Sequence, residues 1–143
     1  MPTAEVYPAM KLPMRIWIAV TGVMANVQAV QCFFGSPTFL AERIYTQQPE
    51  QVTPLTARLF GAWILLAGGL RLGCAYNIHN KHLYNATLYS YILAFGHFST
   101  ELAVYKTADV NFGTVAPLLV SGFSILWMLI GLRSFQKSQS KTS

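Results

Sequence analysis

Long apolar runs separated by short polar segments make up most of the chain. The four longest runs lie at residues 14–34, 56–76, 83–105 and 114–132. A helix of about 20 residues is long enough to cross the hydrocarbon core of a membrane. We therefore predict an all-α fold, an integral membrane four-helix bundle. Residues 1–143 would form one four-span domain, with residues 133–143 as a basic cytoplasmic tail.

The first run could instead be the apolar core of a cleaved signal peptide. Such cores are usually about 7–15 residues long and end at a small-residue cleavage site. The run at 14–34 is longer and contains Asn26, Gln28 and Gln31. These features favour a membrane span.

The composition also indicates a membrane protein. Hydrophobic residues make up 53% of the chain and charged residues 10%, whereas soluble domains contain about 25% charged residues. The net charge is +5, but the ten Lys and Arg residues are scattered singly, so we expect no nucleic-acid partner. Two cysteines cannot form a disulfide framework. Cys32 and Cys74 would lie near opposite membrane faces, so we expect no bond between them.

The basic residues predict the orientation of the chain. Four crossings place both termini on one side, and the cytoplasmic side carries the excess of Lys and Arg. The termini are therefore expected to be cytoplasmic. The sequon at Asn85 would lie on that same side and stay unmodified. The terminal side carries Lys11, Arg15, Lys81, Arg133, Lys137 and Lys141, the opposite side carries Arg43, Arg58 and Lys106, and Arg71 lies within a span.

The connection at residues 35–55 contains Ser36-Pro37, a favourable start for a short helix. Phe39, Leu40 and Ile44 could lay that helix on the membrane surface. An ordinary connecting loop is an equally open alternative.

Several polar residues cluster at the same predicted depth. His97 and Glu101 are four residues apart and share one face of the third span. Because an unpaired charge in lipid is costly, we expect Arg58 to pair with Glu101, with His97, Gln28 and Gln31 completing the network. The alternative is that each side chain reaches separately to the interface.

Arg71 has no acid at its depth. Asn85, Thr87 or a lipid phosphate are its candidate partners. Small residues four apart, Ala57 with Gly61 and Gly69 with Gly73, are typical of close helix packing in lipid. The second glycine pair could serve self-association as a homo-oligomer as well as packing within the chain.

The histidines raise the question of a metal site. His79 and His82 lie in a short connection, and only His97 remains, so we expect no metal. His97 and Glu101 could form an acid–base pair, but a structural network is the commoner role. We therefore expect no catalytic or cofactor-binding residues. Aromatic residues such as Trp63 are expected to be core or interfacial.

Three motifs carry a resemblance to a known family. They are ARLFGAW at 57–63, IHNKHLY at 78–84 and GHFSTE at 96–101, which include Arg58, Gly61, Trp63, Asn80, Gly96, His97 and Glu101. In this order they resemble the ergosterol biosynthetic protein 28 family, and the likeness extends over residues 15–133. The chain departs from the family at both ends and at Leu59 and Ala62.

The resemblance implies a non-catalytic scaffold in the endoplasmic-reticulum membrane. It would hold together three enzymes of sterol C-4 demethylation: a sterol C-4 methyl oxidase, an NAD-dependent decarboxylating sterol 4-carboxylate dehydrogenase and a 3-keto sterol reductase. Tethering raises the effective concentration of each enzyme near its substrate. Two alternatives remain: a small membrane enzyme using His97 and Glu101, and a sterol- or lipid-binding transporter. The transporter would need a polar path across the apolar stretch 61–69.

Overall fold

The structure, a computed structural model, describes residues 2–35 and 38–142 of the chain, and the side chains of residues 12–35 and 40–132. The described residues form helices joined by turns and loops, and they contain no strand. The helices are α1 (Pro2–Phe34), α2 (Thr38–Arg43), η1 (Pro49–Gln51), α3 (Pro54–Tyr76), α4 (Lys81–Ala103) and α5 (Phe112–Thr142). The predicted all-α fold class is confirmed.

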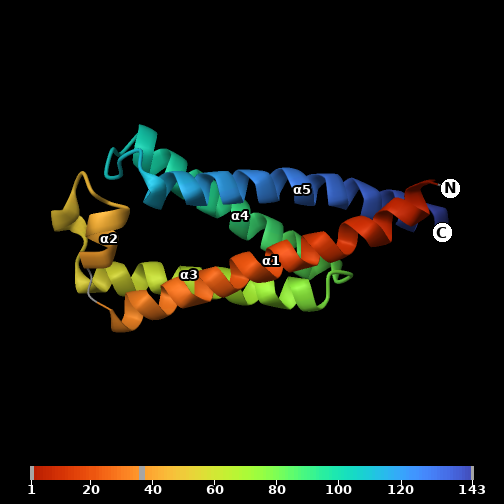
Figure 1. The fold of residues 1–143 in the computed structure, drawn as a ribbon, viewed down its shortest axis with the longest axis horizontal. Coiled ribbons are helices and arrows are strands. Elements are labelled where there is room, and N and C mark those ends of the chain that lie inside the picture. Colours follow the sequence, from red (N-terminus) through yellow and green to blue (C-terminus); the bar gives the residue numbers. More distant parts are fainter. Residues whose placement is uncertain (1, 36–37, 143) are drawn as a thin grey trace.

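The four long helices extend along the long axis of the molecule, with α4 inclined to the others (Figure 1). Helix α1 packs along α3, while α5 packs along α4, and α4 crosses from the end of α3 to the start of α5. The start of α1, the end of α5 and the α3–α4 connection share one end of the molecule. Helix α2 and the α4–α5 connection form the other end, which we call the α2 end.

Buried positions repeat every seven residues along the helices. On α4 they include Tyr84, Tyr91 and Phe98, and on α3 they include Gly61 and Gly68. A seven-residue repeat keeps one face of a helix against a neighbour that crosses it at a shallow angle. The sequence therefore builds a packed interior from evenly spaced aromatic and small residues.

Hydrogen-bonding side chains define where α3 and α4 begin. The Thr53 hydroxyl accepts from the Thr56 backbone N–H at 3.1 Å, and the Asn80 side chain accepts from the Leu83 N–H at 3.1 Å. Each cap satisfies a free N–H of the first helical turn. Helix α5 begins at Phe112, two residues earlier than expected. Pro117 therefore lies in the second turn of this helix.

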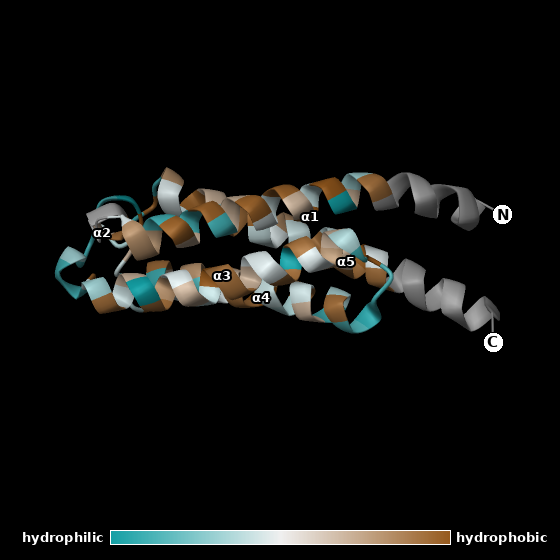
Figure 2. Ribbon diagram, turned by 90° about the horizontal axis from the view of Figure 1, so that it is seen from below, coloured by the Kyte–Doolittle hydropathy of each residue, from teal (hydrophilic) through white to brown (hydrophobic). Residues whose placement is uncertain are grey.

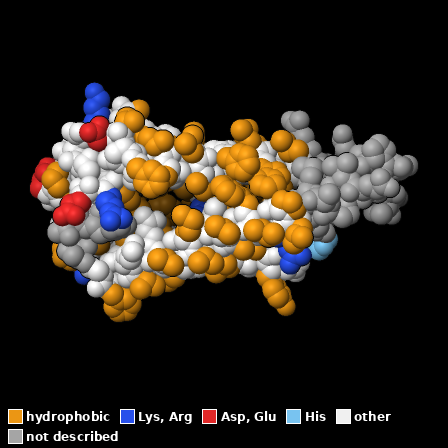
Figure 3. Space-filling view, viewed as in Figure 1, with side chains coloured by type: hydrophobic (Ala, Val, Ile, Leu, Met, Phe, Trp, Pro, Cys, Tyr) orange, Lys and Arg blue, Asp and Glu red, His pale blue; other side chains and the backbone are white. Residues whose placement is uncertain are grey.

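Three helices are long and apolar enough to cross a membrane: Leu12–Phe34, Pro54–Tyr76 and Phe112–Leu132. Figure 2 shows hydrophobic residues spread along these helices, and on the face drawn in Figure 3 hydrophobic side chains cover much of the surface. Within the described residues, α4 does not reach the same hydropathy, because polar residues such as Asn85, Ser90 and Glu101 interrupt it. Of its polar residues, Thr87 and Ser90 are buried, whereas Asn85 is exposed.

The short helix predicted after the first span exists as α2, but its described apolar side chains face the core of the protein and not a membrane surface. Leu40 and Ile44 are almost completely buried in the core at the α2 end, where they pack with Phe60 and Phe98. Burying these side chains inside the protein removes the apolar face that a surface helix would need. Ser36, Pro37 and the Phe39 side chain lie outside the described residues.

Candidate functional site

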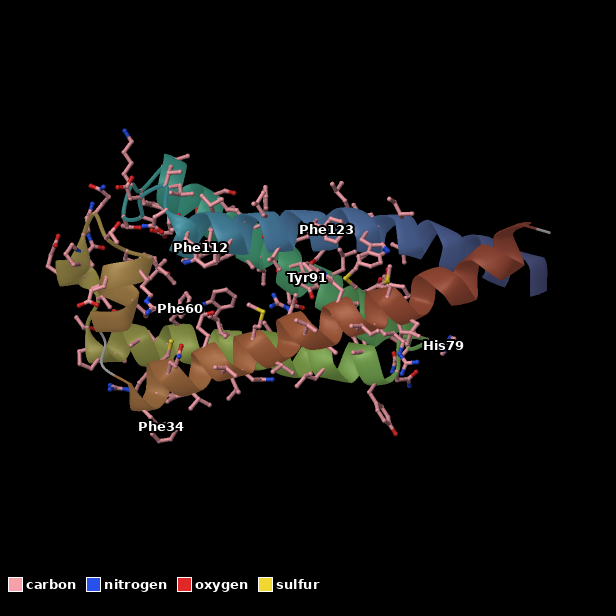
Figure 4. All side chains as sticks on the ribbon, viewed as in Figure 1. Phe34, Phe60, His79, Tyr91, Phe112 and Phe123 are labelled. Atoms are coloured by element: carbon pink, nitrogen blue, oxygen red, sulfur yellow. The ribbon has the colours of Figure 1, made fainter. Side chains whose placement is uncertain are left out.

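A buried arginine lies near the centre of the structure. Arg71 of α3 is only 9% exposed, and its guanidinium carbon lies 4.2 Å from the centre of the Tyr91 ring on α4. Gly22 of α1 lies against the Arg71 side chain, because a methyl group added there would come within 3.1 Å of its Cβ. Figure 4 shows Tyr91 between α1 and α5 in the middle of the molecule. We call Arg71, Tyr91 and the polar groups around them the central site.

Hydrogen bonds connect the central site to α1 and α5. The Tyr91 hydroxyl bonds to the buried Thr21 hydroxyl of α1. The Trp17 indole N–H donates to the Ser124 hydroxyl of α5 at 2.8 Å, and that hydroxyl donates to the Val120 carbonyl at 2.6 Å. Side chains from all four long helices therefore meet here, and their polar groups hold Tyr91 in place.

The guanidinium itself is poorly compensated. Its Nε has no hydrogen-bond partner, and the contact recorded for the guanidinium in the described part of the chain is the one with the Tyr91 ring. A cation–π contact contributes about 0.5–2 kcal/mol, whereas an unpaired buried charge costs several kcal/mol. The contact with Tyr91 alone does not offset the cost of burying Arg71.

The side-chain partners predicted for Arg71 were wrong. The Thr87 hydroxyl donates to the Leu70 carbonyl at 3.0 Å and to the Leu83 carbonyl at 2.8 Å instead. Asn85 is exposed. The sequence prediction of a lipid phosphate at Arg71 is not tested by the structure.

A second cluster surrounds His97 at the α2 end. His97 Nε2 lies 2.7 Å from the Tyr45 hydroxyl. The rings of Phe60, Trp63 and Phe98 lie within 6.4 Å of the imidazole, measured between centroids. This arrangement packs His97 in an aromatic surround and uses its ring nitrogen to hold the segment between α2 and η1.

Burial among these rings raises the pKa of the Tyr45 phenol well above its usual value, and the nearby Glu101 carboxylate acts in the same direction. Tyr45 therefore stays protonated at physiological pH. Its hydroxyl can donate a hydrogen bond to His97 while the imidazole nitrogen accepts it.

The predicted ion pair between Arg58 and Glu101 is absent from the described part of the chain. The Glu101 carboxylate instead accepts a hydrogen bond from Thr107, just beyond the end of α4. Arg58 is exposed, because it lies one residue away from the buried stripe that contains Ala57 and Gly61. Arg58 and Glu101 were predicted to lie at the same depth in the membrane, but this does not bring them together, because Arg58 is exposed and Glu101 is bonded to Thr107.

Gln28 and Gln31 do not complete this network within the described residues. Gln28 is half-buried and Gln31 is exposed, and neither is hydrogen-bonded to His97 or Glu101. The network was therefore correct only in placing His97 and Glu101 on the same helix. Tyr45 and Thr107, which supply the actual partners, lie in connecting segments where helical spacing gives no signal.

The predicted small residues divide into two groups. A Cβ at Gly61 would lie 2.9 Å from Cys32 Cβ, so this glycine is required for the close approach of α1. By contrast, Gly69 and Gly96 have open space around them, and Gly73 makes only ordinary contact with Leu83. The close packing predicted for Gly69 and Gly73 is therefore not found within the described part of the chain, and their use in self-association stays a prediction. Asn80 has a clear role as the cap of α4.

Among the described residues, no group of three or more His, Cys, Asp and Glu side chains could hold a metal ion. Cys32 and Cys74 are both free and buried, and they belong to separate core clusters. The predicted absence of a bond between them is confirmed.

Known proteins identify the family. The family described as "Erg28 like protein" matches residues 14–126. The chain is 48% identical over 120 residues to the ergosterol biosynthetic protein 28 homolog of Homo sapiens, covering 84% of this chain and 85% of that protein. It is 36% identical over 128 residues to the Arabidopsis thaliana protein named ergosterol biosynthetic protein 28, covering 89% and 95% of the two chains. The Saccharomyces cerevisiae protein of that name is 29% identical over 112 residues, covering 78% and 75%. No solved structure matches. The resemblance seen in the sequence motifs is thus confirmed, and the chain belongs to the Erg28 family.

Proposed function

We propose that this protein acts in sterol biosynthesis as a non-catalytic scaffold of the endoplasmic-reticulum membrane. It would hold a sterol C-4 methyl oxidase, an NAD-dependent decarboxylating sterol 4-carboxylate dehydrogenase and a 3-keto sterol reductase in one assembly. The names of its relatives support the pathway, since they are called ergosterol biosynthetic protein 28. The motif resemblance supports the three partners.

The observation that carries the scaffold proposal is that polar side chains in the interior form hydrogen bonds between helices. Trp17 donates to Ser124, and the Tyr84 hydroxyl donates to the Met128 carbonyl at 2.6 Å. Each bond links α5 to another helix. Such bonds hold the helices in fixed positions and leave apolar outer surfaces to contact lipid and partner helices. A bundle of fixed shape is suited to tethering, which requires defined positions more than reactive groups.

The proposal includes four membrane crossings with both termini in the cytoplasm. Helix α4 would cross with the other three because the polar groups near its middle, Thr87 and Ser90, are turned inward. Thr87 and Ser90 are buried, and both donate hydrogen bonds to backbone carbonyls. Polar side chains satisfied in this way are tolerated within a membrane. The excess of basic residues on the terminal side supports cytoplasmic termini.

Affinity purification in mild detergent tests the scaffold. Tagged full-length protein should co-purify all three enzymes, and its loss should cause 4-methyl sterol intermediates to accumulate. A tagged membrane protein of similar size from the same compartment serves as the control. A normal sterol profile after loss of the protein would contradict the proposal.

A second assay separates the scaffold from an enzyme that uses His97 and Glu101. Purified protein should not convert a 4-methyl sterol intermediate with or without NAD. His97→Gln and Glu101→Gln variants, expressed at the normal level, should restore the sterol profile of cells that lack the protein. Turnover by the purified chain, abolished in these variants, would favour the enzyme.

A further inference from the structure

We propose that the central site binds an amphipathic lipid through an oxyanionic head group, a carboxylate or a phosphate, held by Arg71. The first observation is the unpartnered Nε of a side chain that is more than nine-tenths buried. A guanidinium presents donors in a planar fork that matches the geometry of carboxylate and phosphate oxygens. An oxyanion would supply both the missing acceptor and the missing negative charge.

The second observation is the distribution of acidic groups. Every Asp or Glu side chain that the structure describes lies toward the α2 end: Glu42, Glu50, Glu101 and Asp109. Figure 3 shows acidic side chains gathered there. Glu101 lies ten residues beyond Tyr91 on α4, which corresponds to about 15 Å of helix rise. No described carboxylate is therefore placed to neutralise Arg71, and the counter-ion has to come from elsewhere.

The third observation is an opening toward the site. Helix α1 and helix α5 contact each other only slightly, since each packs mainly on a different partner. Figure 3 shows this face hollowed between them, with part of a basic side chain visible inside the hollow. Both helices carry exposed apolar side chains, among them Val20 on α1 and Phe123 on α5. An apolar tail could lie in this opening while the head group reaches the guanidinium.

The surrounding groups suit an oxyanion. Tyr91 lies against the guanidinium, and its hydroxyl is held by Thr21, so the ring fixes the direction of the charge. Trp17 and Ser124 are bonded to each other beside them. The hydroxyl and indole hydrogens of these groups are already donated within the protein, since Thr21 donates to the Ile18 carbonyl and Ser124 to the Val120 carbonyl. The Arg71 guanidinium is therefore the donor that remains for an anion, and none of the neutral groups carries a charge that would repel it.

Titration calorimetry on the full-length protein in neutral detergent micelles tests the proposal. The probes are oleate, dioleoyl phosphatidic acid, oleyl alcohol and inorganic phosphate. We expect saturable binding of one or both anionic lipids, and oleyl alcohol, which has the same chain without the charge, should bind at least about tenfold more weakly. Arg71→Gln should weaken binding of the anionic lipids by about tenfold or more. Arg58→Gln is the matched control on the same helix, because Arg58 is exposed.

Three results would overturn the proposal: equal losses in Arg71→Gln and Arg58→Gln, equal affinities for oleate and oleyl alcohol, or no saturable binding of either anionic lipid. Inorganic phosphate binding as tightly as the lipids would show that the anion comes from water and would refute the lipid assignment. If Arg71→Gln does not fold, Arg71→Lys keeps the charge but lacks the Nε, and it should bind the lipids several-fold more weakly than Arg58→Lys. Equal affinities of these two lysine variants would refute the role of the guanidinium.

Discussion

The close packing of α1 on α3 can be tested with one methyl group. In a Gly61→Ala variant the new Cβ would lie 2.9 Å from Cys32 Cβ, 3.3 Å from Phe33 Cε2 and 3.4 Å from the Ala29 carbonyl oxygen. Cys32 Cβ is attached directly to the α1 backbone, so it cannot move aside unless the helix moves. Forcing an extra methyl group into a packed interface costs about 1–3 kcal/mol.

The opposing effect is smaller. Alanine favours a helix over glycine by up to about 1 kcal/mol in water, and by less in lipid, where the backbone keeps its hydrogen bonds in any case. Gly61→Ala is therefore expected to destabilise the protein. Gly69→Ala is the matched control on the same helix, because no atom lies within 4 Å of its added Cβ. It should leave stability unchanged or raise it slightly.

Unfolding by sodium dodecyl sulfate in mixed micelles, followed by tryptophan fluorescence, measures both variants. A loss of about 1.4 kcal/mol corresponds to a tenfold fall in the ratio of folded to unfolded protein. If Gly61→Ala matches the wild type, or if Gly69→Ala loses as much stability as Gly61→Ala, the proposed close approach of α1 is refuted.

Three further substitutions address other parts of the structure. Gly113→Ala would place a Cβ in collision with the Arg43 carbonyl oxygen, so it should lower stability by about 1–3 kcal/mol and reduce the melting temperature in detergent. Tyr45→Phe removes the hydroxyl bonded to His97 and should cost about 1 kcal/mol near neutral pH. Because the raised pKa of Tyr45 makes the fold hold this proton more tightly, wild-type stability should fall as the pH rises above about 10, and the variant should lack that part of the loss. Arg71→Met removes a charge that has no charged partner, so lipid-free protein should be at least as stable as the wild type; a large loss would show that Arg71 is structural.

The positions of the long helices could be predicted from apolar length alone. The predicted run at 56–76 differs from α3 (Pro54–Tyr76) by two residues, and the run at 83–105 is shifted by two residues from α4 (Lys81–Ala103). The starts of α3 and α4 differ because caps decide these boundaries, whereas α1 and α5 extend beyond the apolar runs to Pro2 and Thr142. Thr53 and Asn80 are residue types that favour helix caps, but they lie outside the apolar runs, so the lengths of these runs do not include them.

The polar contacts could be predicted less well, because depth in a membrane does not specify rotation about a helix axis. Arg58 and Glu101 were paired by depth, yet Arg58 is exposed. Tyr45 could not be assigned to His97 from spacing, since the contact depends on how the 35–53 connection folds back over α3. Such contacts follow from tertiary packing, and they have no local signature.

The seven-residue repeat contains the rotational information that the depth argument lacked. On α3, Ala57, Ile64 and Arg71 are spaced by seven and all are buried, so Arg71 occupies a packing position rather than a surface position. On α4, Tyr91 belongs to the seven-residue repeat of buried residues that also contains Tyr84 and Phe98. The register that packs the helices therefore also brings a cation into the interior against an aromatic ring. An apolar residue at that repeat position would satisfy the packing equally well. Packing therefore does not require an arginine at this position, and the anion binding proposed above is a role that suits its unpartnered guanidinium.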